Sequence, residues 1–199
     1  MAQSPPGLDG LAWLIVVDMQ NVFARPQSQW CTPGFDAILD NTRSLVEAFR
    51  ERVVFTRFVA PEDPEGAWRN YYRAWPFALV PASSPIYDLV ETLPHHGHRV
   101  VSRSTFGKWD DRPGSLREVT SGARTLVLSG VSTDCCVLST ALAAADAGVE
   151  VRVVADACAG LSPTDHRRAL DAMSLYAPLV TLTSTADVLD QLNGSGRKG

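Results

Sequence analysis

The stretch TLVLSGVSTDCCVLSTALAAADAG occupies residues 125–148 and joins two different residue patterns. Residues 125–131 form a short, largely apolar run, which favours a strand buried on both faces. Residues 133–147 are rich in alanine, which favours a helix. A strand that leads directly into a helix is the unit from which parallel sheets with helical layers are built.

The same alternation continues along the rest of the chain. We predict strands at residues 11–17, 52–59, 98–103, 125–131, 149–156 and 179–183. We predict helices at residues 33–50, 84–93, 114–122, 133–147, 162–176 and 184–192. Residues 60–84, rich in proline and aromatic side chains, predict an irregular excursion with a short helix. This pattern predicts an α/β fold, a three-layer αβα arrangement around a doubly wound, Rossmann-like, parallel six-stranded sheet, with 11–17 and 125–131 at its centre.

Length and composition are those of an ordinary soluble globular protein. The chain has 199 residues, of which 45% are hydrophobic and 20% charged, and its net charge is −4. We therefore expect one domain over 1–199, with 1–10 and 193–199 as flexible tails. The acidic balance argues against nucleic acid and against a membrane as partner. The first ten residues, MAQSPPGLDG, lack the pattern of a signal peptide.

The four cysteines do not resemble a disulfide framework or a zinc site. They are Cys31, Cys135, Cys136 and Cys158, with no CxxC pair. We expect a reducing cytoplasm, and we expect no metal and no cofactor. The histidines of HHGH at 95–98 precede a predicted strand, so we expect them in a solvated turn at its amino end.

Ligands of doubly wound sheets bind outside the carboxyl ends of the strands. Asp18 follows five straight apolar residues at such an end, so it is a candidate general base or cation partner; capping the next turn is the alternative. Cys135 and Cys136 lie at the start of the predicted helix, where backbone N–H groups and the helix dipole favour a thiolate. Either thiol could be activated, or both could simply pack the helix on the sheet, and spacing does not choose between them.

Four segments resemble the isochorismatase-like cysteine hydrolase superfamily: VVDMQNVF (16–23), VVSRSTFGKW (100–109), GVSTDCCVLSTALAAADAG (130–148) and VVADACAG (153–160). The third segment matches the family motif in register at Gly130, Thr133, Cys136, Val137, Thr140 and Ala141. The resemblance implies that Cys136 is the nucleophile and Asp18 the acid/base. It also implies a homo-oligomer, a dimer or larger.

The resemblance further implies a cis peptide bond between Val131 and Ser132, with an oxyanion hole formed by the N–H groups of Ser132 and Cys136. The partner of this site would be a small-molecule substrate. We expect this substrate to contact five further residues, Gln20, Phe23, Phe106, Trp109 and Thr133.

The sequence departs from the family at the catalytic lysine. Counting back six residues from Trp109 gives Arg103. Arginine would keep the positive charge at this position but could not shuttle a proton. Alternatively, Lys108 bends into the same space, or the relay is lost. The histidines that the nicotinamidase branch uses for metal are also missing after the second strand, where the chain reads TRFVAPEDPEGAW (56–68).

The resulting prediction is a cysteine hydrolase that cleaves a C–N bond of a small amide, imide or carbamoyl compound through a Cys136 acyl-enzyme. One alternative is a vinyl-ether hydrolase of the isochorismatase type, which uses the acid and not the thiol. Another is a catalytically impaired binding protein on the same fold.

Overall fold

The sheet is parallel and has β1 and β4 at its centre, as predicted. The computed structural model describes residue 8 and residues 11–195. Its strands are β1 (Ala12–Val17), β2 (Val53–Phe58), β3 (Arg99–Arg103), β4 (Thr125–Val131), β5 (Glu150–Ala159) and β6 (Val180–Thr183). They form one six-stranded sheet in the order β3-β2-β1-β4-β5-β6, and every neighbouring pair is parallel. The order reverses between β1 and β4, which makes their carboxyl ends the switch point.

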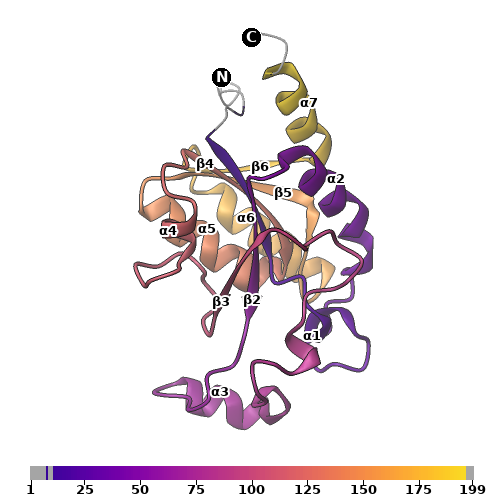
Figure 1. Ribbon diagram of the computed structural model, residues 1–199, viewed down its shortest axis with the longest axis vertical. Coiled ribbons are helices and arrows are strands. Elements are labelled where there is room, and N and C mark those ends of the chain that lie inside the picture. The colour runs from indigo at the N-terminus through magenta and orange to yellow at the C-terminus, as the bar shows by residue number, and fades with distance from the viewer. Residues whose placement is uncertain (1–7, 9–10, 196–199) are drawn as a thin grey trace.

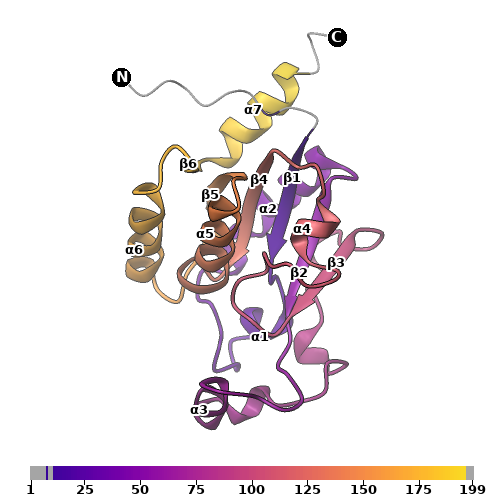
Figure 2. The same cartoon turned by 90° about the vertical axis from the view of Figure 1, so that its left-hand side faces the viewer.

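Helices cover both faces of this sheet (Figures 1 and 2). One layer contains α2 (Leu39–Phe49) and α7 (Thr185–Ser195), and the other contains α4 (Leu116–Val119), α5 (Leu138–Asp146) and α6 (Pro163–Ser174). The short helices α1 (Asn21–Ala24) and α3 (Trp68–Ala74) lie beyond the carboxyl ends of β1 and β2 (Figure 1). Each layer packs on its own hydrophobic cluster, one containing Phe49 and Val188 and the other Leu116 and Met173. The predicted three-layer α/β fold is confirmed.

Single helical turns occupy four further segments: η1 (Asp36–Ile38), η2 (Pro76–Ala78), η3 (Pro85–Tyr87) and η4 (Thr133–Val137). The predicted helix over 84–93 is therefore wrong beyond η3. Its apolar residues serve another purpose, because Leu89 forms a β-bridge with Gln20 and the Val90 N–H donates to the Met19 carbonyl. The apolar residues of this buried loop are spaced as they would be in an amphipathic helix, which explains the wrong prediction.

The ends of the chain differ in part from the prediction. Helix α7 continues to Ser195, so residues 193–195 are helical, although we predicted a flexible tail from 193. Leu8 is buried in a hydrophobic cluster. The remaining predicted tail residues, 1–7, 9–10 and 196–199, lie outside the described part of the chain.

Gly130 allows the two central strands to approach closely at their carboxyl ends. Its φ is +109°, and a Cβ at this position would lie 2.1 Å from the carbonyl oxygen of Val17. Only glycine combines this backbone conformation with so little space. The close contact brings the residues that follow β1 and those that follow β4 to the same point.

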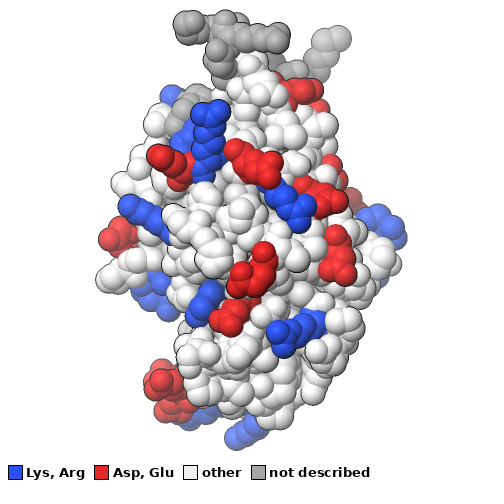
Figure 3. All heavy atoms as spheres, turned by 45° about the vertical axis from the view of Figure 1, so that its right-hand side comes forward, with Lys and Arg blue, Asp and Glu red and all other residues white. Residues whose placement is uncertain are grey.

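One face of the surface and the described helices bear on the partners that composition argues against. On the face shown in Figure 3, acidic and basic side chains are interspersed rather than gathered into a basic surface. Among the described helices, none has the length and apolar character needed to cross a membrane.

Candidate active site

Asp18 is a fully buried carboxylate immediately after β1. Its φ is +49°, a conformation that aspartate tolerates better than most residues. The hydroxyl of Thr56 donates to Asp18 Oδ1 over 2.6 Å and accepts from the Asp18 N–H over 3.1 Å. Asp18 Oδ2 lies 2.8 Å from Lys108 Nζ, and neither side chain is exposed. The contact of Oδ2 with the ammonium is an ion pair rather than a well-aligned hydrogen bond, because this oxygen has no partner of regular hydrogen-bond geometry.

The Lys108 ammonium is fixed by several groups at once. It donates to the carbonyl oxygens of Thr105 (2.9 Å) and Phe106 (3.1 Å), and it lies 5.2 Å from the centre of the Phe58 ring. The Lys108 backbone N–H donates to Thr140 Oγ1 in α5 over 3.1 Å, which ties the loop to the nucleophile helix. A lysine buried without such partners would be very costly, so this arrangement serves to hold a positive charge beside Asp18.

Arg103 does not occupy the lysine position that we expected it to fill. Its guanidinium pairs with Asp110 over 2.9 Å and donates to the carbonyl oxygens of Ser102 and Pro113. Strand β3 lies at one edge of the sheet and is separated from β1 by β2. Arg103 therefore finds its carboxylate partner, Asp110, in the loop that follows β3. The same loop returns to the sheet centre and carries Lys108 to Asp18.

Cys136 lies at the beginning of the helix after β4 and is only 4% exposed. The turn η4 is π-helical, with the Val137 N–H donating to the Ser132 carbonyl over 3.1 Å. Burial raises the pKa of the Cys136 thiol well above its ordinary value, the nearby Lys108 charge lowers this pKa, and the charge and hydrogen bond of Asp18 raise it. The expected stabilisation of a thiolate by the helix start is therefore outweighed by desolvation. The Cys136 thiol faces the Asp18 carboxylate.

The turn around the thiol is fixed by its neighbours. Asp134 Oδ1 accepts from the Ser132 hydroxyl over 3.1 Å and from the Leu161 N–H over 2.9 Å. Thr133 Oγ1 lies 2.8 Å from His166 Nδ1 on α6. The peptide bond between Val131 and Ser132 is cis.

A cavity of about 230 Å³ opens beside the thiol. It contains four of the residues singled out from the sequence, Phe23, Phe106, Ser132 and Cys136. Its other lining residues are Gln29, Trp30, Thr32, Phe58, Tyr71, Trp75, Asp134, Cys135 and Leu161.

Three residues expected to bind substrate lie outside this cavity. The Gln20 amide is used for structure, because it donates to the carbonyl oxygens of Phe58 and Tyr87 and accepts from the Phe58 N–H. Thr133 is fully buried against His166. Trp109 packs on the hydrophobic cluster that contains Leu116. Val131 is a buried residue of β4 and does not line the cavity.

Sequence reasoning missed Trp30, which is central to the cavity. Its ring lies within 5.0–6.2 Å, centre to centre, of five other aromatic rings, those of Phe23, Phe58, Tyr71, Trp75 and Phe77. The aromatic residues between 66 and 77 were the available signal: Tyr71 and Trp75 pack on Trp30 and line the cavity.

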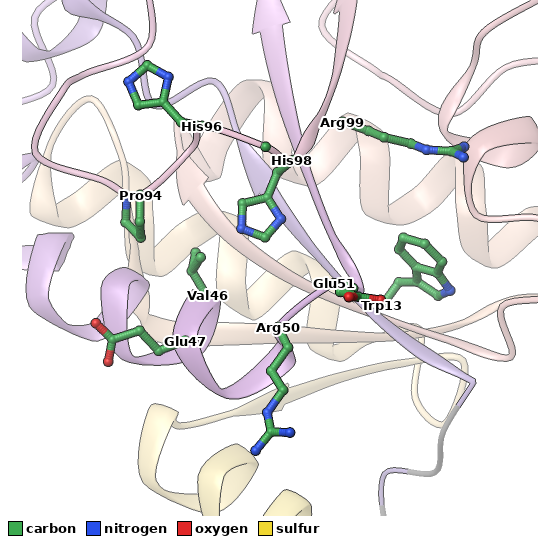
Figure 4. A pocket seen from close by; sticks show the side chains of 10 residues that line it. Trp13, Val46, Glu47, Arg50, Glu51, Pro94, His96, His98 and Arg99 are labelled. Atoms are coloured by element: carbon green, nitrogen blue, oxygen red, sulfur yellow. The ribbon is translucent and has the colours of Figure 1, made fainter.

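A larger cavity lies elsewhere, at the amino ends of the strands (Figure 4). It measures about 660 Å³ and is lined by residues such as Trp13, Arg50, His98 and Arg99. The nearby side chains of Glu91, His95 and His96 are close enough to share a metal ion. Both features are remote from Cys136, so we assign the chemistry to the smaller cavity, which contains the buried Cys136 thiol.

The comparison with protein-family models decides the family. The isochorismatase domain model matches residues 12–187, which covers every strand and the site described above. The chain belongs to the isochorismatase family. This membership supports a hydrolase, as the sequence predicts.

Individual relatives of this isochorismatase-family chain are distant. Isochorismatase domain-containing protein 2 of Xenopus laevis is 42% identical over 74 residues, which is 37% of this chain and 35% of that protein. A cysteine hydrolase from Pseudomonas syringae pv. phaseolicola is 22% identical, with a TM-score of 0.84 over 97% of this chain and 100% of that one.

Two further solved structures are amidases by name. N-carbamoylsarcosine amidase from Thermoplasma acidophilum is 23% identical, with a TM-score of 0.69 over 87% of this chain and 96% of that one. Pyrazinamidase of Pyrococcus horikoshii, solved in complex with zinc, is 27% identical, with a TM-score of 0.67 over 87% of this chain and 98% of that one.

Proposed function

We propose that this protein is a cysteine hydrolase that cleaves the C–N bond of a small amide, imide or carbamoyl compound. The observation that carries the proposal is the buried set of Cys136, Asp18 and Lys108 beside a cavity of about 230 Å³. The amidases among the structural neighbours support the choice of a C–N bond.

The geometry supports a two-step reaction. In the first step Asp18 takes the proton of the Cys136 thiol while Sγ attacks the substrate carbonyl carbon, and a C–S bond forms. The C–N bond then breaks, and the proton held by Asp18 moves to the leaving nitrogen. In the second step Asp18 removes a proton from water, whose oxygen attacks the thioester carbonyl carbon. The C–S bond then breaks, the acid is released, and the proton held by Asp18 returns to Cys136 Sγ.

The other groups of the site hold the reacting side chains in position and stabilise the charges that form during the reaction. Lys108 pairs with Asp18 and orients it, and the Lys108 charge lowers the pKa of the Cys136 thiol, which favours the thiolate that forms during attack. The N–H groups of Ser132 and Cys136 would stabilise the oxyanion, a contribution that is often worth about 3–4 kcal/mol per donor. Because Lys108 supplies the cation beside Asp18, an impaired relay is the less favoured reading.

The test compares two adjacent cysteines that both line the cavity. Cys136→Ala should abolish the hydrolysis of small amides, whereas the matched control Cys135→Ala should keep most of the activity. Circular dichroism and thermal melting check that both variants fold. Hydrolysis that persists in Cys136→Ala would refute the nucleophile and favour vinyl-ether hydrolysis, in which the acid alone acts.

Other aspects of the function are proposals from the sequence. We propose that residues 1–199 form one domain, that the protein acts in the reducing cytoplasm, and that it forms a homo-oligomer. The four cysteines are all free, which agrees with a reducing compartment.

A further inference from the structure

The cavity beside Cys136 has an unusual charge balance for an enzyme of small polar compounds. Six of its lining side chains are aromatic: Phe23, Trp30, Phe58, Tyr71, Trp75 and Phe106. None of the described residues that line it is a lysine, an arginine or a histidine. A substrate carboxylate that entered would lose its hydration without gaining a cationic partner, which is costly.

Three cations that neighbour lining residues along the chain are engaged elsewhere. Lys108 is used by Asp18 and by two backbone carbonyl oxygens. On α3, Arg69 donates to the Pro64 carbonyl oxygen and Arg73 donates to the Asn70 side chain. Neither arginine lines the cavity, although both flank residues that do.

Among the described residues that line the cavity, the one charged side chain is negative. Asp134 lies next to Cys135, and one of its oxygens is held by the Ser132 hydroxyl and the Leu161 N–H. A second carboxylate in this small space would be repelled as well as desolvated.

Size and shape limit the substrate further. The volume of about 230 Å³ is below the range of roughly 300–1,000 Å³ that is usual for drug-sized ligands. The Trp30 ring is nearly parallel to that of Phe23, with an interplanar angle of 12°, and it meets the Phe58 and Phe77 rings edge-on. Such walls favour a flat or short apolar group.

We propose that the substrate class of this site is uncharged amides with a small, flat or apolar acyl group, and that the site discriminates against amides that carry a carboxylate. This inference rests on the proposed function for its site, but its test measures binding and does not require turnover.

The experiment compares benzamide with 4-carbamoylbenzoate, which share the ring and the amide and differ in one carboxylate. Their dissociation constants are measured by isothermal titration calorimetry at neutral pH with the full chain and with Cys136→Ala. We expect benzamide to bind at least about tenfold more tightly in both proteins.

A gain-of-function variant tests the cause. Gln29 lines the cavity and is exposed, so Gln29→Arg adds the missing cation without removing an aromatic wall. Gln27 is exposed in the same loop but does not line the cavity, and Gln27→Arg is the matched control. Gln29→Arg should reduce the preference for benzamide to about threefold or less, and Gln27→Arg should leave it unchanged.

Tighter binding of 4-carbamoylbenzoate by the unmodified protein would overturn the inference, as would binding of neither compound. An equal response of the two arginine variants would also overturn it. Failure of the proposed function would give a different result: Cys136→Ala would still hydrolyse amides, and the preference for the neutral compound would remain.

Discussion

Replacing Lys108 by methionine tests the buried ion pair, because methionine keeps most of the side-chain volume and removes the ammonium together with its hydrogen bonds to the Thr105 and Phe106 carbonyl oxygens. Lys108 Nζ and Asp18 Oδ2 are 2.8 Å apart and both side chains are fully buried. Removing one partner of such a pair leaves an unpaired buried charge, which typically costs about 3–5 kcal/mol. For a chain of this size that corresponds to a fall in melting temperature of roughly 6–20 °C. The hydrogen bond from Thr56 remains on Oδ1, so the lower half of both ranges is expected.

The assay is urea unfolding followed by circular dichroism, with turnover of a small amide measured in parallel. Lys108→Met should lose stability and nearly all activity. The double variant Asp18→Asn with Lys108→Met should recover most of the stability and none of the activity. A single variant as stable as the original protein, or a double variant less stable than the single one, would refute the reasoning.

The remaining predictions concern the thiol and the sheet centre. Because burial raises the pKa of the Cys136 thiol, iodoacetamide should alkylate it more slowly at pH 7 than free cysteine. The alkylation rate should still increase beyond pH 9, and a rate that reaches its plateau below pH 8 would contradict this. Asp18→Asn removes a group that raises this pKa and leaves Lys108, so alkylation at pH 7 should become faster while hydrolysis is lost; parallel losses of both would contradict the assigned roles. Gly130→Ala should destabilise the fold by about 3 kcal/mol in urea unfolding, since its Cβ would meet the Val17 carbonyl; a change below about 1 kcal/mol would contradict the close contact.

The central strands were predictable because their signal is local. Residues 125–131 are a strand with the bounds that apolar patterning indicates, and the alternation of strands and helices determined the parallel sheet. Local patterning failed at 84–93, where apolar residues face the core from a loop rather than from a helix.

The motif around Cys136 and Asp18 was also visible in the sequence, but the choice between Arg103 and Lys108 as the cation beside Asp18 was not. Counting positions selected Arg103, since a sequence does not show how a loop returns to the sheet. The structure shows that Arg103 has a carboxylate of its own in Asp110, while the bond from the Lys108 N–H to Thr140 brings that lysine back to the centre.

Two features depend on tertiary packing: the pKa of the Cys136 thiol and the composition of the cavity wall. A position at a helix start favours a thiolate, and only the burial of Cys136 shows that the opposite effect is larger. Trp30 belongs to no motif, and its importance comes from the five rings that the fold gathers around it. Such contacts join residues that are far apart in the sequence.

The central claim is that Cys136 carries the acyl group during turnover. Its most direct test is rapid acid quenching of the enzyme during hydrolysis of benzamide, followed by proteolysis and mass spectrometry of the peptide that contains both adjacent cysteines. The account predicts a benzoyl adduct on Cys136 that disappears in Cys136→Ala and persists in Cys135→Ala. Continued hydrolysis with the adduct on Cys135, or with no adduct on either thiol and undiminished turnover in Cys136→Ala, would contradict it.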